Sequence, residues 1–250
     1  MVDIPFFFSN LWAGAIDYVL PPVCGGCGEP VIDNAGICGT CWADLTFISA
    51  PCCSCCGYPF ELSAGDEALC GECLRVPKSF DRCRSAISYD DHSRDMIIGY
   101  KHADRTHLGQ LFSTWLALVG KEIIQETDFI VPVPLHPKRL FLRRYNQSAL
   151  LAQRIAKEYG RKYLPDLLIR VKNTSSQGHL SKTGRWENVR SAFQINPKYN
   201  EIIVGEKITL IDDVYTTGAT LEACSRTLQK VNVARVDALV VARVLARVPT

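Results

Sequence analysis

The sequence predicts an α/β fold built on a mostly parallel sheet and preceded by a small N-terminal module rich in cysteine. Three observations predict it. Apolar strand-like segments alternate with helix-like segments after residue 80, which is typical of a parallel sheet covered by helices on both faces. One strand runs directly into two acidic residues and a loop of threonine and glycine, between Ile208 and Thr220. Ten of the twelve cysteines lie between Cys24 and Cys73.

The charge of the chain changes sign after the cysteine-rich part. Residues 1–80 carry two basic and nine acidic side chains, a net charge of −7, whereas residues 81–250 carry a net charge of +9. Two compositions in one chain predict two modules, 1–80 and 81–250. Apolar residues make up 47% and charged residues 22% of the 250 residues, which excludes a disordered or fibrous protein.

The sequence favours a cytoplasmic protein. Its apolar runs are shorter than the roughly 20 residues that a membrane-spanning helix needs. The first residues lack a basic segment and include Asp3, unlike an export signal. Apolar residues recur at helical spacing ahead of Pro21-Pro22, which predicts an N-terminal helix; they are Leu11-Trp12, Ile16 and Val19-Leu20. Because this helix contains no Lys or Arg, we expect it to pack on the protein rather than on anionic lipid.

Cysteines in the N-terminal module come as pairs separated by two residues, the spacing of zinc-ribbon sites. Two such pairs supply four thiolates, which close a tetrahedral site and leave no open position, so the zinc is expected to be structural. A disulfide framework and an iron–sulfur cluster are the alternatives, and the first needs an oxidising compartment. Sequential pairing is the simplest arrangement, with interleaved pairing or a single occupied site left open. The predicted zinc ligands are Cys24, Cys27, Cys38, Cys41, Cys53, Cys56, Cys70 and Cys73.

The register of the third pair is ambiguous, because residues 52–56 contain four cysteines and also allow the pair Cys52–Cys55. We predict Cys53–Cys56, since Gly57 then follows the pair as Gly28 follows the first pair. A glycine at that position lets the chain turn beneath the metal.

The second module is expected to alternate strands and helices. Strands are expected at 84–89, 129–133, 207–212 and 236–244, with shorter ones at 167–171 and 202–204. Helices are expected at 94–100, 108–125, 147–159 and 221–231. One face of the helix at 108–125 is apolar at spacings of three and four, through Leu108, Leu111, Phe112, Trp115 and Val119.

The segment from Ile208 to Thr220 indicates the functional site. In parallel sheets ligands bind beyond the carboxyl ends of the strands, and Asp212 and Asp213 lie at such an end. The threonine loop that follows opens a helix, and its N–H groups and hydroxyls suit a phosphate. Two acids beside a phosphate site suit sugar hydroxyls or a divalent cation, so the segment describes a phosphorylated ribose. A plain strand–turn–helix in which Asp213 only caps the helix is the alternative.

These residues resemble a known family. Residues 208–220 are similar, without a gap, to the phosphoribosyl-diphosphate signature of type I phosphoribosyltransferases. The whole chain resembles the ComF family of competence-associated proteins, which join a zinc-ribbon head to a phosphoribosyltransferase-like domain. The family pattern has glycine where this chain has Arg144, which puts a tight turn there in question. The resemblance is carried by the cysteine-rich head, Phe80-Asp81, Tyr100-Lys101, Val131-Pro-Val-Pro134, Arg143-Arg-Tyr-Asn146-Gln147 and 174–193.

The resemblance implies a role for each matching residue. Asp212 and Asp213, the catalytic candidates, would hold the ribose hydroxyls and help to orient a Mg²⁺–diphosphate. The loop 216–220 would bind the 5′-phosphate, and the loop 134–139 the diphosphate, with Arg143 and Arg144 nearby. A solvated basic loop is the alternative for 134–139. The substrate-binding candidates are Thr216, Thr217, Gly218, Ala219, Thr220, Lys138, Arg139 and Lys101.

A polar segment at 177–190 is expected to be either a mobile lid over the reacting centre or a surface connector. His179 in this segment and His102, just after the helix expected at 94–100, are acid–base candidates, although a lone loop histidine is more often simply solvated.

The resemblance therefore implies a protein that binds phosphoribosyl diphosphate with Mg²⁺ and transfers phosphoribosyl to a nitrogen acceptor, in a role linked to DNA uptake. The alternative is a non-catalytic competence factor that binds single-stranded DNA or proteins of the competence machinery. The positive charge of residues 81–250 motivates that alternative. The sequence predicts neither the acceptor nor the oligomeric state.

Overall fold

The computed structural model describes residues 22–32, 36–62, 65–101, 105, 107–172 and 191–245. The expected N-terminal helix, the segment 177–190, His102 and His179 lie outside these residues. Among the residues described, no helix has both the length and the apolar character needed to cross a membrane.

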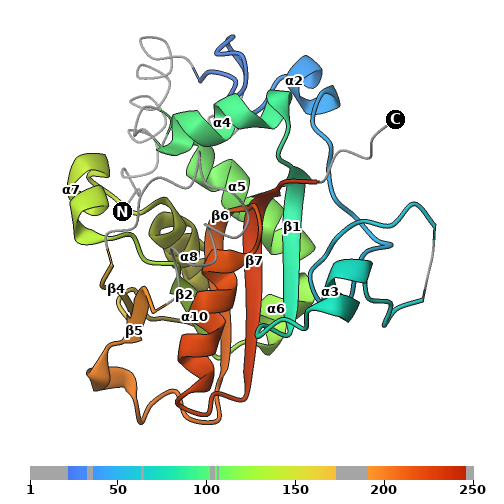
Figure 1. The fold of residues 1–250 in the computed structure, drawn as a ribbon. Helices are drawn as coiled ribbons and strands as arrows, with labels where there is room; N and C mark the ends of the chain where they lie inside the picture. Colours follow the sequence, from blue (N-terminus) through green and yellow to red (C-terminus); the bar gives the residue numbers. More distant parts are fainter. Residues whose placement is uncertain are drawn as a thin grey trace, which may run out of the picture.

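Five strands form the main sheet (Figure 1), in the order β1-β7-β6-β2-β3, and every neighbouring pair is parallel. Because the strands are parallel, their carboxyl ends share one edge of the sheet, and β6 lies in the middle of that edge. The strands are β1 (Arg82–Ser88), β2 (Phe129–Pro132), β3 (Lys162–Tyr163), β6 (Lys207–Tyr215) and β7 (Arg235–Arg243).

Helices cover both faces of this sheet. In Figure 1, α10 (Ala219–Gln229) lies in front of it, and α5 (Leu108–Val119), α6 (Lys121–Glu126) and α8 (Gln147–Glu158) lie behind it. Side chains alternate between the two cores along β2, since Ile130 packs with α5 and α8 while Val131 packs with α10. Burial on both faces explains why the strands are almost continuously apolar.

Three expected elements differ from the observed ones. The helix at 108–125 is two helices, α5 and α6, which meet at Gly120. The segment 167–171 forms β4 (Leu168–Arg170), which pairs antiparallel with β5 (Phe193–Ile195) in a separate sheet. The expected strand at 202–204 is a turn in which only the middle residue is buried, so a short apolar run alone did not predict a strand.

The remaining helices lie outside the two faces of the sheet. Two belong to the cysteine module, α2 (Gly39–Ala43) and α3 (Gly71–Arg75), and two lie at the carboxyl edge, α4 (Asp91–Lys101) and α7 (Pro137–Arg143). The 3₁₀ helix η2 (Pro197–Tyr199) follows β5. Helix α7 lies in the segment expected as a basic loop. It begins with Pro137, at a position where proline's missing N–H costs no helical hydrogen bond, and the His136 side chain accepts from the Lys138 N–H at 3.3 Å.

The cysteine-rich module covers the edge strand β1. Ile48 N donates to Ala86 O at 2.9 Å and Cys83 N donates to Cys55 O at 2.6 Å, so this strand's backbone is paired although it ends the sheet. The first half of the module packs behind the sheet, where Trp42 and Trp115 lie 6.2 Å apart between ring centroids. The second half shares the front core, which contains Cys53, Cys56, Cys73 and Phe80. The two halves therefore straddle the sheet.

Candidate functional site

Eight cysteines form two clusters. The Sγ atoms of each cluster lie within 4.8 Å of one another, and the structure groups the pairs sequentially, with Cys53–Cys56 and not Cys52–Cys55 in the second cluster. Tetrahedral zinc with Zn–S bonds of about 2.3 Å separates its sulfurs by about 3.8 Å. The Sγ–Sγ distances of 3.7 Å for Cys27–Cys38 and 3.6 Å for Cys56–Cys70 match that spacing. The clusters therefore fit two structural zinc ions.

Backbone N–H groups prepare these sulfurs for a cation. Gly26 N and Cys38 N point at Cys24 Sγ, at 3.4 and 3.3 Å. Burial raises the pKa of the Cys24 thiol, but these donors and the Cys27 N–H outweigh it and lower the pKa to about 6. In the second cluster, Cys70 N donates to Cys53 Sγ at 3.3 Å. Burial raises the pKa of Cys41 to about 12 and that of Cys56 to about 11, so zinc binding at neutral pH still releases protons from these thiols.

Arg243 joins the second cluster to the sheet. It ends β7, is 3% exposed, and donates to Cys56 O through Nη1 and to Cys56 Sγ through Nη2 at 3.5 Å. Its guanidinium carbon lies 4.4 Å from the Tyr215 ring centroid and 5.2 Å from that of Tyr58. Gly57, next to the cluster, has φ +70° and no room for a Cβ against the Cys83 carbonyl. Close packing thus holds the cluster against the carboxyl ends of β6 and β7.

A cavity of about 840 Å³ opens at the carboxyl edge of the sheet. It extends from the end of β2, across the end of β6, to the ends of β7 and β1 and the start of α4. Of the residues predicted from the sequence, it is lined by Asp212, Asp213, Thr216, Thr220, Arg139 and Lys101.

The two acids lie at the centre of this cavity in different environments. Asp212 accepts from the Asp213 N–H at 2.9 Å and from Ser148 Oγ at 3.2 Å. Burial, and then the charge of Asp213, raise the pKa of Asp212 to about 7. The Asp213 carboxylate pairs with Lys101 Nζ at 3.1 Å. Lys101, expected to contact phosphate, therefore lies beside the two acids and pairs with Asp213.

The segment Tyr145–Gln147 explains how Lys101 reaches this position. Tyr145 Oη donates to Tyr100 O at 2.6 Å, and Gln147 Nε2 donates to Lys101 O at 2.7 Å, so the end of α4 is tied to the start of α8. Asn146 caps α8 and also donates to Val133 O at 3.0 Å, which ties α8 to the end of β2. These polar side chains hold three walls of the cavity together.

The loop after β6 turns sharply into α10. Gly218 precedes the helix with φ +75°, and a Cβ there would collide with the Tyr215 ring, so the position needs glycine. Ala219 N lies 3.4 Å from Thr217 Oγ1. Thr216 and Thr220 face the cavity, whereas Gly218 and Ala219 are buried and contribute backbone. The loop thus presents hydroxyls and a helix N-terminus to a ligand beside the acids.

The opposite side of the cavity is basic. Arg139 and Arg143 of α7 line it together with Arg170 of β4. Burial, followed by the charge of Arg143, lowers the pKa of Arg139, and burial followed by the charge of Arg139 lowers the pKa of Arg170. Clustered guanidinium groups of this kind suit a multiply charged anion. Lys138 is exposed on the far side of α7 and does not line the cavity.

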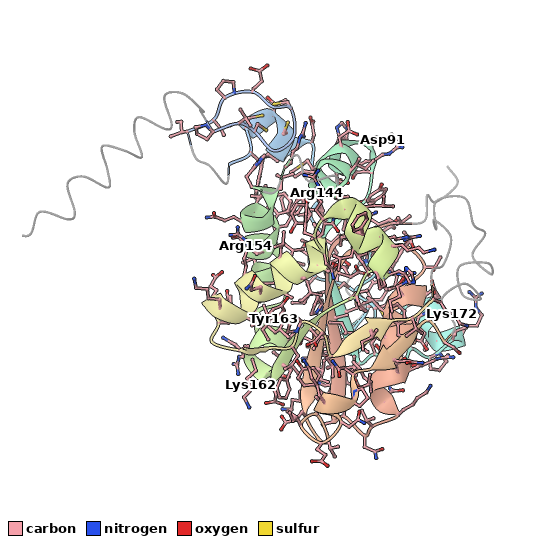
Figure 2. All side chains as sticks on the ribbon, turned by 90° about the vertical axis from the view of Figure 1, so that its left-hand side faces the viewer. Asp91, Arg144, Arg154, Lys162, Tyr163 and Lys172 are labelled. Carbon is pink, nitrogen blue, oxygen red and sulfur yellow. The ribbon has the colours of Figure 1, made fainter. Side chains whose placement is uncertain are left out.

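The chain makes a tight turn at Arg144, although the family pattern has glycine at this position. Arg144 follows α7 (Figure 2). Its φ of +65° lies in the left-handed region that glycine favours. The arginine therefore adopts a glycine-like backbone conformation, which costs about 1 kcal/mol for a residue with a Cβ.

Comparison with known proteins supports the predicted family resemblance. Residues 15–74 match the family described as "Double zinc ribbon domain". Competence protein F of Haemophilus influenzae is 29% identical over 221 residues, which cover 86% of this chain and 94% of that protein. DNA utilization protein YhgH of Escherichia coli K12 is 28% identical over 232 residues, covering 90% and 99%. Competence protein ComFC of Bacillus subtilis is 28% identical over 199 residues, covering 77% of each chain. The chain therefore resembles the ComF family over most of its length.

Solved structures similar to this chain include an allosteric regulatory enzyme of purine biosynthesis, with a TM-score of 0.39 and 16% identity over 58% of this chain and 30% of that one. Adenine phosphoribosyltransferase has a TM-score of 0.36 and 16% identity, covering 56% and 72%. The observed topology itself confirms the predicted fold class, a mostly parallel α/β sheet with a small N-terminal zinc-ribbon module.

Several residues that line the large cavity were not among the predicted site residues. Ser148 was missed although it follows the Asn-Gln pair by one position, a signal that the sequence does contain. Arg170 was missed because it lies in a strand expected to join the main sheet. Asp90 and Arg94, near the start of α4, line the far end of the cavity and carry no local motif. Only the fold brings these segments together.

Proposed function

We propose that this protein binds phosphoribosyl diphosphate with Mg²⁺ and transfers its phosphoribosyl group to a nitrogen acceptor. The observation that carries the proposal is the order of groups around one cavity. Thr216 and Thr220 suit the 5′-phosphate, Asp212 and Asp213 suit the ribose hydroxyls, and the arginines beside β2 suit the diphosphate.

The residues would act by positioning and by charge. Breaking the bond between C1 and diphosphate leaves positive charge on the ribose ring, which Asp212 and Asp213 would offset from the centre of the cavity. Arg139 and Arg143 would stabilise the departing diphosphate. Mg²⁺, when bound with the diphosphate, would neutralise part of its charge. Asp212 and Asp213 offer oxygen ligands that suit this cation, directly or through water.

The DNA-linked role rests on the relatives. Two of the similar proteins are named competence proteins, and a third is named a DNA utilization protein. We propose that this chain acts in the same kind of process, with its ligand site contributing to DNA uptake or use.

Calorimetric titration tests the ligand. Phosphoribosyl diphosphate should bind wild-type protein in the micromolar range and only with Mg²⁺, and the variant Asp212→Asn/Asp213→Asn should lose at least about 100-fold in affinity, since it removes both ribose contacts. Asp44→Asn/Asp66→Asn, at two exposed positions, is the control with the same change in charge. Equal affinity in the site variant, or no binding to the wild type, would refute the proposal.

A non-catalytic DNA-binding role is the second candidate, favoured by the surface of α7. Phe141 and Leu142 are 86% and 80% exposed on this helix, next to Lys138 and Arg144. An exposed aromatic ring among basic side chains suits base stacking on single-stranded DNA. Fluorescence anisotropy with a labelled oligonucleotide should then show affinity that falls steeply with salt and weakens in Phe141→Ser. No binding at moderate salt would remove this candidate.

A further inference from the structure

The second cysteine cluster lies near the loop that follows β6, and Arg243 connects the two. A cavity of about 320 Å³ lies between the cysteine module and this loop, and Arg243 lines it together with Thr216 and Thr217. Thr216 also lines the large cavity, so the loop separates the two cavities. Because a cavity and not packed core lies behind it, the loop depends on the few side chains that reach it from this side.

Arg243 is a buried cation whose negative partner is the cysteine cluster. It ends β7, is 3% exposed, and donates to Cys56 O through Nη1 and to Cys56 Sγ through Nη2 at 3.5 Å. Within the described part of the chain, no Asp or Glu forms an ion pair with Arg243. Four thiolates around a divalent zinc ion leave about two negative charges. Because a buried charge needs a partner, the zinc-loaded cluster is the counter-ion that holds this guanidinium in place.

The guanidinium in turn holds the ring of Tyr215. Its carbon lies 4.4 Å from the centroid of this ring, and Tyr215 is 4% exposed. The two residues are partners in the register of β6 and β7, and Val244 N donates to Tyr215 O at 2.9 Å. Phe80 packs edge-on against the same ring, with 6.4 Å between centroids. Arg243 and Phe80 therefore fix the ring at the point where β6 ends.

The Tyr215 ring supports the turn of the loop at Gly218. A Cβ on Gly218 would lie 2.6 Å from Tyr215 Cζ, so the ring lies directly against the glycine backbone. The body of α10 is anchored separately, since Glu222 accepts from Ser79 N at 2.8 Å and from Ser79 Oγ at 2.6 Å. A shift of the ring would therefore move the turn and the N–H groups that begin α10, which suit a phosphate, without releasing the helix.

We propose that Arg243 is a positioning residue, which transmits the position of the second zinc cluster through Tyr215 to the loop 216–220. The inference rests on the proposed function, because it takes this loop as the site of the 5′-phosphate. It gives the second zinc a part in ligand binding besides its part in folding. Side chains that hold a binding loop in one conformation lower the cost of ordering it around the ligand.

The first cysteine cluster supplies the comparison. Arg105 donates to Gly25 O at 2.9 Å and to Gly26 O at 3.1 Å, so it also holds the backbone of a cysteine turn. Among the residues described, neither Arg105 nor any cysteine of the first cluster lines either cavity. Arg105→Met is therefore a matched control for Arg243→Met, with the same change in charge and in size.

Hydrogen–deuterium exchange followed by mass spectrometry tests the link without any ligand. In zinc-loaded Arg243→Met, the peptide that contains 216–220 should exchange about tenfold faster than in the wild type, while the peptide that contains α7 keeps the wild-type rate. Tyr215→Leu leaves Arg243 and Cys56 unchanged, and should have the same effect at wild-type zinc content. Arg105→Met should match the wild type in both peptides.

Calorimetry measures the consequence for binding. Phosphoribosyl diphosphate with Mg²⁺ should bind Arg243→Met and Tyr215→Leu about tenfold more weakly than the wild type, and Arg105→Met with unchanged affinity. Loop exchange at the wild-type rate in folded Arg243→Met or in Tyr215→Leu, equal acceleration of the α7 peptide in Tyr215→Leu, or faster loop exchange with unchanged affinity overturns the inference. Failure of the ligand to bind the wild type refutes the proposed function instead, while the exchange rates still decide whether Arg243 holds the loop.

Discussion

The free energy of unfolding of Asp212→Asn should rise relative to that of the wild-type protein as the pH is raised, when both are measured without ligand. Asp212 lies at the end of β6, where burial and the neighbouring Asp213 carboxylate raise its pKa to about 7. The hydrogen bonds from Asp213 N and Ser148 Oγ offset only part of that shift. Ionisation of Asp212 therefore destabilises the folded protein relative to the unfolded chain.

The size and sign of the effect follow from linkage. An unfolded aspartate has a pKa of about 3.9, so between about pH 4 and pH 7 the folded protein holds a proton that the unfolded chain has released. Stability from this group is therefore greatest below about pH 4, falls as the pH rises, and levels off above about pH 7. Between about pH 6 and pH 8 the wild type should lose about 1.4 kcal/mol relative to Asp212→Asn, whose amide does not titrate.

Urea denaturation followed by circular dichroism, at constant zinc and without Mg²⁺, measures this difference at the two pH values. Ser148→Ala provides an internal check, because loss of its hydrogen bond should raise the pKa of Asp212 further and enlarge the loss of stability. The reasoning is refuted if the stability gap between wild type and Asp212→Asn is the same at about pH 6 and pH 8.

Four further predictions concern Lys101, Gly218, Arg144 and the two zinc sites. Lys101→Met removes the cation beside Asp213 and should weaken phosphoribosyl diphosphate binding about tenfold by calorimetry, with an unchanged affinity counting against its role. Gly218→Ala forces a Cβ into a left-handed turn and against Tyr215, and should lower the free energy of unfolding by at least about 1 kcal/mol in urea denaturation. Arg144→Gly relieves a left-handed arginine and should raise that free energy by about 1 kcal/mol, whereas a loss would show that other contacts hold the arginine there. Chelation should release two zinc ions per chain and lower the Tm by more than about 10 °C, because structural zinc contributes on the order of 10 kcal/mol to folding.

Contiguous patterns in the sequence were sufficient to predict the sheet class, the two cysteine clusters and the acidic strand end. In each case the signal and the structure are local. Two cysteines on one turn share a metal because the turn itself sets their spacing, and Asp212 and Thr216 line one cavity because they are only four positions apart in the chain.

Only the tertiary structure decided which distant residues meet these segments. The direction in which α7 leaves β2 puts Arg139 into the cavity and Lys138 in solvent, although the two are adjacent in sequence. Lys101 reaches Asp213 because Gln147 ties the end of α4 to the start of α8. Arg243 meets Cys56, 187 positions away in the chain. Such contacts depend on which element faces pack together, and that is set by burial summed over the whole sheet rather than by any single motif.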